Sequence, residues 1–138
     1  MIKNMKSGFS AGIIAGFVGG VVAFILIIIG NITGIWVPFE GALNDVVFLT
    51  NQAVTHIGLN TIWGTIFGLI YSRFYDLIPG KGIWKGLYFG LLLFLIINIS
   101  QASYLAAFGS FFWVIGNFYV AFPIRIIYGF VLGALYEK

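Results

Sequence analysis

One charged side chain falls where a membrane-spanning helix tolerates it least. Arg125 lies eleven residues before Tyr136 inside an apolar run, which at about 1.5 Å per residue places it roughly 16 Å into the membrane. A charge at that depth costs about 2.5–3.5 kcal/mol on insertion scales, so the side chain must face the protein interior or a water-filled cavity. Pro123 has no amide hydrogen for the carbonyl of Tyr119, which leaves a second polar group near the same depth.

The polar side chains that could partner Arg125 are few. They are Asn60, Asn98 and Gln101, with Glu40 or Asp45 if the first loop folds inward. One hypothesis is an anion- or polar-solute-binding site around Arg125. The other is a buried arginine, hydrogen-bonded to helix ends and amides, that locks the bundle or an oligomer. Removing a partner from a buried charge is costly in either case, so a loss of stability would not separate the two hypotheses.

The single histidine stands close to the same residues. His56 precedes Asn60 by four residues, about one helical turn, so the two side chains can share a cavity. An imidazole there could relay protons near neutral pH, or it is an interfacial polar residue near the outer surface. The candidate polar or solute-binding residues are therefore Arg125, Asn60, Asn98, Gln101 and His56.

The residue counts argue against a metal site, a cofactor and an enzyme. One histidine and four carboxylates, with no closely spaced ligand pair, offer no metal-binding set on a helix. The absence of cysteine excludes disulfides, thiolate metal sites and Fe–S clusters within the chain. Asp45, His56, Ser100 and Ser103 fall toward one side, but no spacing singles out a nucleophile and no G-x-S-x-G elbow exists. We expect no metal, no cofactor and no catalytic residue.

Composition indicates which elements must position these side chains. Of the 138 residues, 61% are apolar and 8% are charged, whereas soluble domains average about 45–50% apolar and about 25% charged residues. An apolar helix of about 20 residues spans a bilayer, and four fit here, at about 9–30, 51–75, 83–107 and 112–136. We expect an all-α integral membrane protein, a single four-helix transmembrane domain over residues 1–138, with the lipid bilayer around it.

The longest segment outside these helices is the outer-face loop 31–50. Pro38 lies inside it and breaks a helix, while Trp36 and Phe39 suit the level of the lipid headgroups. A short surface helix is expected over about 39–49.

Glycines recur every four residues along the predicted helices. Rows of small residues let membrane helices approach closely. The helix-packing glycines, several in G-x-x-x-G pairs, are Gly12, Gly16, Gly64, Gly68, Gly86, Gly90, Gly129 and Gly133. A bundle this small has little interior, so any row that is not used inside it would favour a homo-oligomer or a larger membrane complex.

The two halves of the chain share a pattern. The motif Gly64-x-x-x-Gly68-x-x-Tyr71-x-Arg73 recurs 65 residues later as Gly129-x-x-x-Gly133-x-x-Tyr136-x-Lys138. The same offset places Asn60 opposite Arg125, and the glycine row of the first helix recurs 74 residues later. Each half holds two spans, which predicts two parallel hairpin repeats related by an axis along the membrane normal. The alternative is chance matching between glycine-rich membrane helices.

Basic residues predict the orientation. In the four-helix arrangement one side of the membrane holds Lys3, Lys6, Arg73, Lys81, Lys85 and Lys138. The loops of the other side carry no Lys or Arg, so both termini should be cytoplasmic in a multi-pass protein of the cell (cytoplasmic) membrane. The apolar run after Lys6 is longer than that of a signal peptide, so we expect the first helix to be retained. The net charge of +3 forms no basic patch, and we expect no nucleic-acid partner.

A resemblance covers about residues 56–90. It is carried by Gly64-Thr-Ile-Phe-Gly68-Leu-Ile-Tyr71 and then by Leu77-Ile-Pro79-Gly80-Lys81-Gly82-x-x-Lys85-Gly86-Leu87-x-Phe89-Gly90. This stretch resembles the YagU-like group, small polytopic prokaryotic membrane proteins of unknown function. The resemblance implies a small polytopic membrane protein and transfers no catalytic residues.

Two functions follow from these patterns. The first is a non-enzymatic scaffold, accessory subunit or homo-oligomer, which predicts a dry Arg125 whose hydrogen bonds are satisfied. The alternative is a small channel or carrier for an anion or polar solute, which predicts that Asn60, Asn98 and Arg125 converge on a water-accessible cavity. An intramembrane enzyme would need a carboxylate or His56 within about 3 Å of a nucleophile.

Overall fold

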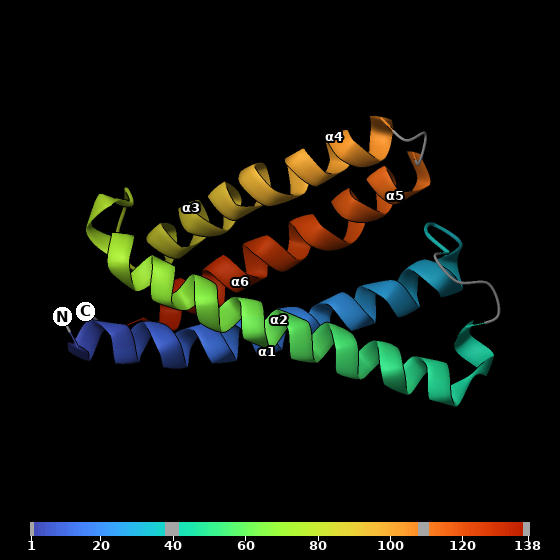
Figure 1. Cartoon of the computed structure of the whole chain (residues 1–138), viewed down its shortest axis with the longest axis horizontal. Coiled ribbons are helices and arrows are strands. Elements are labelled where there is room, and N and C mark those ends of the chain that lie inside the picture. Colours follow the sequence, from blue (N-terminus) through green and yellow to red (C-terminus); the bar gives the residue numbers. More distant parts are fainter. Residues whose placement is uncertain (1, 38–41, 108–110, 137–138) are drawn as a thin grey trace.

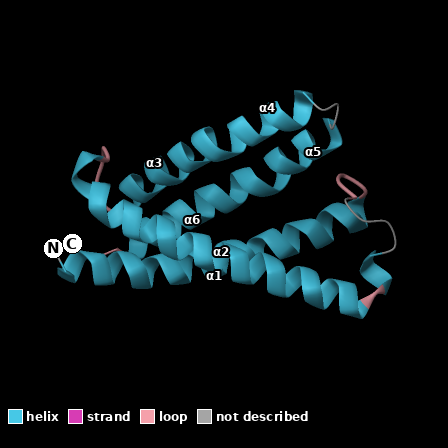
Figure 2. Cartoon of the chain, in the orientation of Figure 1, coloured by secondary structure: helices cyan, strands magenta, loops and turns pink. Residues whose placement is uncertain are grey.

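The computed structural model describes residues 2–37, 42–107 and 111–136, and its regular elements in those ranges are all helical (Figures 1 and 2). The first two rods are α1 (Ile2–Thr33) and α2 (Val46–Phe74), with short 3-10 turns at η1 (Ala42–Asn44) and η2 (Tyr75–Leu77). The third rod joins α3 (Ile83–Leu93), η3 (Phe94–Ile99) and α4 (Ser100–Ala107). The fourth joins α5 (Phe111–Gly116), η4 (Asn117–Ala121) and α6 (Phe122–Leu135).

Four helical segments are long and apolar enough to cross a membrane. They are Asn4–Thr33, Val46–Leu77, Ile83–Tyr104 and Phe111–Leu135. Large apolar side chains such as Leu77 and Val46 are mostly exposed on the protein surface, which suits a lipid solvent and not water. The prediction of an all-α, four-span, multi-pass membrane protein is confirmed.

The loop after α1 differs from the surface helix expected over about 39–49. Residues 38–41 lie outside the described residues, 42–44 form η1, and α2 already begins at Val46. The reason is Asp45, whose Oδ1 accepts a hydrogen bond from the amide of Phe48 at 3.0 Å and so acts as an N-cap. The second half of the expected surface helix is therefore the first turn of α2.

Glycines bring α1 and α2 into close contact. A Cβ added at Gly12 would overlap the carbonyl oxygen of Gly64, and one added at Gly16 would overlap the carbonyl oxygen of Asn60. The two helix backbones thus lie nearer to each other than any side chain would permit, as small-residue rows allow in membranes.

The second hairpin is built in the same way from α3 and α6. A Cβ at Gly86 would overlap the carbonyl oxygen of Gly129, and one at Gly90 would overlap that of Arg125. Each of these contacts has a counterpart in the first hairpin. The residue on α3 lies 74 positions after its counterpart on α1, and the residue on α6 lies 65 positions after its counterpart on α2.

An aromatic core joins the two hairpins at the end of the bundle that holds both termini. The rings of Tyr71 and Tyr136 meet edge to face with centroids 5.2 Å apart, and Tyr75 lies 4.7 Å from Tyr136. Burial raises the pKa of the Tyr136 hydroxyl. The buried core residues are Ala11, Ala15, Phe67, Tyr71, Phe89, Leu93, Tyr128, Leu132 and Tyr136.

The hairpins spread apart toward the opposite end, where α1 and α4 end and α2 and α5 begin (Figure 1). On one side of the bundle α1 packs against α6, whereas on the other side α2 and α3 make almost no close backbone contact. This difference leaves space between the hairpins, and the polar residues lie beside that space.

Candidate functional site

The side chains of the third and fourth rods form one hydrogen-bonded polar group. Nε of Arg125 donates to Oδ1 of Asn98 at 3.2 Å. Nδ2 of Asn98 donates to Oδ1 of Asn117 at 3.1 Å, and Nδ2 of Asn117 donates to the backbone carbonyl of Asn98 at 2.8 Å. Asn98 is only 5% exposed. Its hydrogen bonds with Asn117 fix the orientation of its amide, and so the position of the Oδ1 that accepts from Arg125.

Irregular helix geometry positions the two amides. Asn98 lies in η3 and Asn117 begins η4, and both segments are π-helical turns. Pro123 has no amide hydrogen for the carbonyl of Tyr119, and the wider turn of η4 ends at Ala121, two residues before this proline. Single π-turns inside α-helices occur frequently at functional sites, and these two face each other across the paired amides.

The positive charge of Arg125 has no counter-charge in the described structure. Its guanidinium carbon lies 5.6 Å from the ring centroid of Phe67, a cation–π distance. Among the residues that the structure describes, none accepts a hydrogen bond from the two terminal guanidinium nitrogens, and no carboxylate pairs with them. Asp45, one expected partner, caps α2 instead, and Glu40 lies outside the described residues.

Two cavities adjoin this group. A cavity of about 450 Å³ is lined by the predicted residues His56, Asn60, Asn98 and Gln101, and also by Asn117. The second cavity, of about 420 Å³, has as its lining Trp63, Phe67, Ile97, Gln101 and Arg125. Gln101 borders both, so the structure brings the five predicted polar residues to two adjacent spaces and not to a single one.

The two predicted polar residues of α2 stand apart from the hydrogen-bonded group. Nδ2 of Asn60 donates to the backbone carbonyl of His56 at 2.8 Å, a bond within its own helix, and His56 is half-buried. Their link to Asn98 is the cavity that they share with it. A solute of moderate size would therefore contact residues of both hairpins.

Two contributors were missed by the sequence reasoning. Asn117, like Asn98, is an amide residue within an apolar run. It could have been predicted as a site residue for that reason. Trp36, which suits the headgroup level, is 7% exposed, because Gly116 has no side chain and the indole occupies that space. Trp36 also packs on Phe112 and Trp113. Its buried indole nitrogen has no acceptor among the described residues, and its ring borders the 450 Å³ cavity.

Fold and site together define a small multi-pass membrane protein in which four spanning helices surround a polar group at mid-span. Comparisons with family models, with curated proteins and with solved structures find no match to this chain. The resemblance to the YagU-like group stays a prediction, and the function must be argued from the site.

Proposed function

We propose that this protein is a small channel or carrier that binds an anion or polar solute at Arg125 and moves it across the membrane. The observation that carries the proposal is the position of this arginine. Its guanidinium lines a cavity, lies 14 residues from the start and 10 from the end of its span, and has one hydrogen-bond partner among the described residues. An unneutralised charge at that depth marks a functional site by default, and an anionic solute would supply the missing counter-charge.

The incompletely hydrogen-bonded arginine supports this function over the scaffold, although Arg125 lines a cavity next to the one that Asn60 and Asn98 share and not the same one. A scaffold predicts a dry arginine whose hydrogen bonds are satisfied, but only Nε of Arg125 is engaged by a described residue. The scaffold hypothesis also predicts that some glycine rows are not used inside the bundle and are free to pack against a second copy. All eight helix-packing glycines face backbone within their own hairpin, so these rows give no support to a homo-oligomer.

We infer that the two hairpins are parallel repeats. The support is that glycine contacts in α1–α2 recur in α3–α6 at the predicted offsets, and that Tyr71 and Tyr136, one offset apart, touch each other. In transporters built from repeats, the solute site lies near the midplane at the repeat interface. Asn60 and Arg125, also one offset apart, border the space between the hairpins.

The repeat suggests how a solute would be moved. Tyr71, Tyr75 and Tyr136 (the tyrosine core) pack together at the end that holds both termini, which the basic residues predict to be cytoplasmic. The hairpins spread at the other end. Rocking one hairpin against the other about the tyrosine core would expose Arg125 to the two sides in turn.

The test is solute uptake by proteoliposomes that contain the purified protein. A panel of hydrophilic anions, including chloride, phosphate and acetate, is compared with potassium and with an uncharged sugar. We expect uptake of at least one anion that the Arg125→Gln variant loses and the Arg125→Lys variant partly retains. If every solute crosses equally in wild-type and Arg125→Gln vesicles, with both proteins folded, the proposal is wrong.

A further inference from the structure

The bundle is closed on one side and open on the other. Under the repeat relation, the contact of α1 with α6 should have its counterpart between α3 and α2. The first contact is extensive and the second is nearly absent. The side formed by α2 and the third rod (α3, η3 and α4) instead holds two cavities, so a ligand could enter from the surrounding lipid there without disturbing the α1–α6 side.

Of these two cavities, only the one nearer mid-span has a charged residue, Arg125, in its lining. The guanidinium of Arg125 and the amide of Gln101 form its polar part, and Trp63, Phe67 and Ile97 form its apolar part. Trp63 is 52% exposed, so this cavity lies at the lipid-facing surface. An anionic group placed there would meet the terminal guanidinium nitrogens that no described residue engages.

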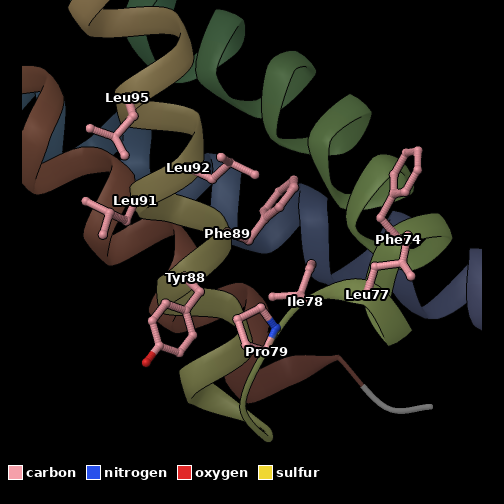
Figure 3. A pocket seen from close by; sticks show the side chains of 9 residues that line it. All are labelled: Phe74, Leu77, Ile78, Pro79, Tyr88, Phe89, Leu91, Leu92 and Leu95. Carbon is pink, nitrogen blue, oxygen red and sulfur yellow. The ribbon is translucent and has the colours of Figure 1, made fainter.

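The cavity nearer the termini is apolar. This cleft, of about 420 Å³, is formed by the end of α2 and the following turn on one side and by α3 and η3 on the other (Figure 3). Its lining residues are Phe74, Leu77, Ile78, Pro79, Tyr88, Phe89, Leu91, Leu92 and Leu95. Ile97, which lines the charged cavity, and Tyr88, which lines the cleft, are nine residues apart in the third rod. At the rise of a helix, this separation is roughly 14 Å.

We propose that the ligand is an amphiphile with one anionic headgroup and an alkyl chain, which enters from the bilayer between α2 and α3. The headgroup binds Arg125 and Gln101, and the chain lies in the apolar cleft toward Pro79. This assignment rests on the proposed function and names its substrate class. A lateral opening lined by apolar side chains favours a ligand that is already dissolved in lipid, and the arginine selects the negatively charged ones.

The experiment uses a photoactivatable analogue of lauric acid with a diazirine at the end of the chain, in proteoliposomes of phosphatidylcholine. The matched probe is the corresponding alcohol, which has the same chain and no charge. We expect saturable cross-linking of the acid to cleft residues such as Leu92 and Leu77, and weak, unsaturable cross-linking of the alcohol. Competition by unlabelled lauric acid or by phosphatidic acid shows whether a carboxylate or a phosphate headgroup is preferred.

Variants separate the headgroup contact from the chain contact. Arg125→Gln removes a charged hydrogen-bonding partner and should weaken binding of the acid at least about tenfold. The affinity of Arg125→Lys for the acid should lie between those of Arg125→Gln and wild type. Leu92→Trp fills the cleft and should abolish the chain cross-links. Ile25→Trp, at an equally exposed position on α1 outside both cavities, should leave them unchanged and controls for folding.

The outcomes distinguish this inference from the proposed function. Equal cross-linking of acid and alcohol, a distribution over all lipid-facing helices, or no competition by either lipid would overturn the inference. If a hydrophilic anion nevertheless crosses in an Arg125-dependent manner, the proposed function stands and only the amphiphile is wrong. If neither the anions nor the acid depends on Arg125, both proposals fail.

Discussion

Replacing Gly86 by alanine would place a methyl group where α6 already lies. The added Cβ would overlap the carbonyl oxygen of Gly129 and approach the Cα of Gly133 to 2.6 Å. Both are backbone atoms, which cannot rotate away as a side chain would. The hairpin must therefore open, and overpacking of this kind costs about 1–3 kcal/mol.

The matched control is Gly58, whose added Cβ would have nothing within 4 Å. Alanine there should be neutral or stabilising by up to about 1 kcal/mol, because alanine favours a helix over glycine. Because both glycines are helical, the propensity gain cancels in the comparison, and the expected difference between Gly86→Ala and Gly58→Ala is about 1–3 kcal/mol, equivalent to roughly a fivefold or larger change in the unfolding equilibrium.

The assay is unfolding of the purified protein in mixed micelles by added SDS, followed by circular dichroism. Gly12→Ala, the counterpart of Gly86→Ala in the first hairpin, should lower the free energy of unfolding by a similar amount. The reasoning is refuted if Gly86→Ala and Gly58→Ala unfold at the same SDS fraction. If only one hairpin is sensitive, the glycine contacts of the two hairpins are not equivalent.

Two further substitutions test single contacts by the same unfolding assay. Lys85→Met should lower the free energy of unfolding by about 1.5–3 kcal/mol, since Nζ donates to the carbonyls of Tyr75 and Ile78 in the turn that follows α2; an unchanged midpoint would mean that water replaces these bonds. Tyr128→Phe should cost about 0.5–1.5 kcal/mol, because its buried hydroxyl donates to the carbonyl of Gly64 at 2.9 Å; no loss would show that this bond between the hairpins adds no net stability.

Much of the fold could be predicted because the membrane restricts the possibilities. Apolar length alone locates four spans, since only helices and closed barrels satisfy their backbone inside lipid. The glycine spacing likewise predicts which faces pack. The start of α2 was placed about five residues late, because the cap at Asp45 is a local hydrogen bond that apolar length does not report.

The candidate site could be predicted only in part. Arg125, Asn98 and Gln101 were recognisable because a polar side chain inside a span must find a polar environment. The π-turns that aim Asn98 and Asn117 at each other have no clear sequence signature in η3, which contains neither proline nor glycine. The burial of Trp36 could not be predicted, because it depends on a contact with Gly116, a residue distant in the chain.

The open side of the bundle could not be predicted at all. The repeat pattern treats α1–α6 and α3–α2 as equivalent, so the sequence offered no reason for one contact to form and the other to be lost. The difference arises from how the whole hairpins pack, and the two cavities on the α2–α3 side follow from it.

The proposed solute path requires that water reach the 450 Å³ cavity between the hairpins, which is lined by Asn98, the hydrogen-bond partner of Arg125. Since the chain has no cysteine, Ala121→Cys on the wall of the 450 Å³ cavity and Phe122→Cys beside it, which does not line that cavity, form a matched pair. We predict that a membrane-impermeant thiol reagent labels position 121 from the side of the 31–45 loop, that position 122 stays unlabelled, and that a transported anion protects position 121. Equal labelling at both positions, or none at 121 in a folded and inserted protein, would contradict the account.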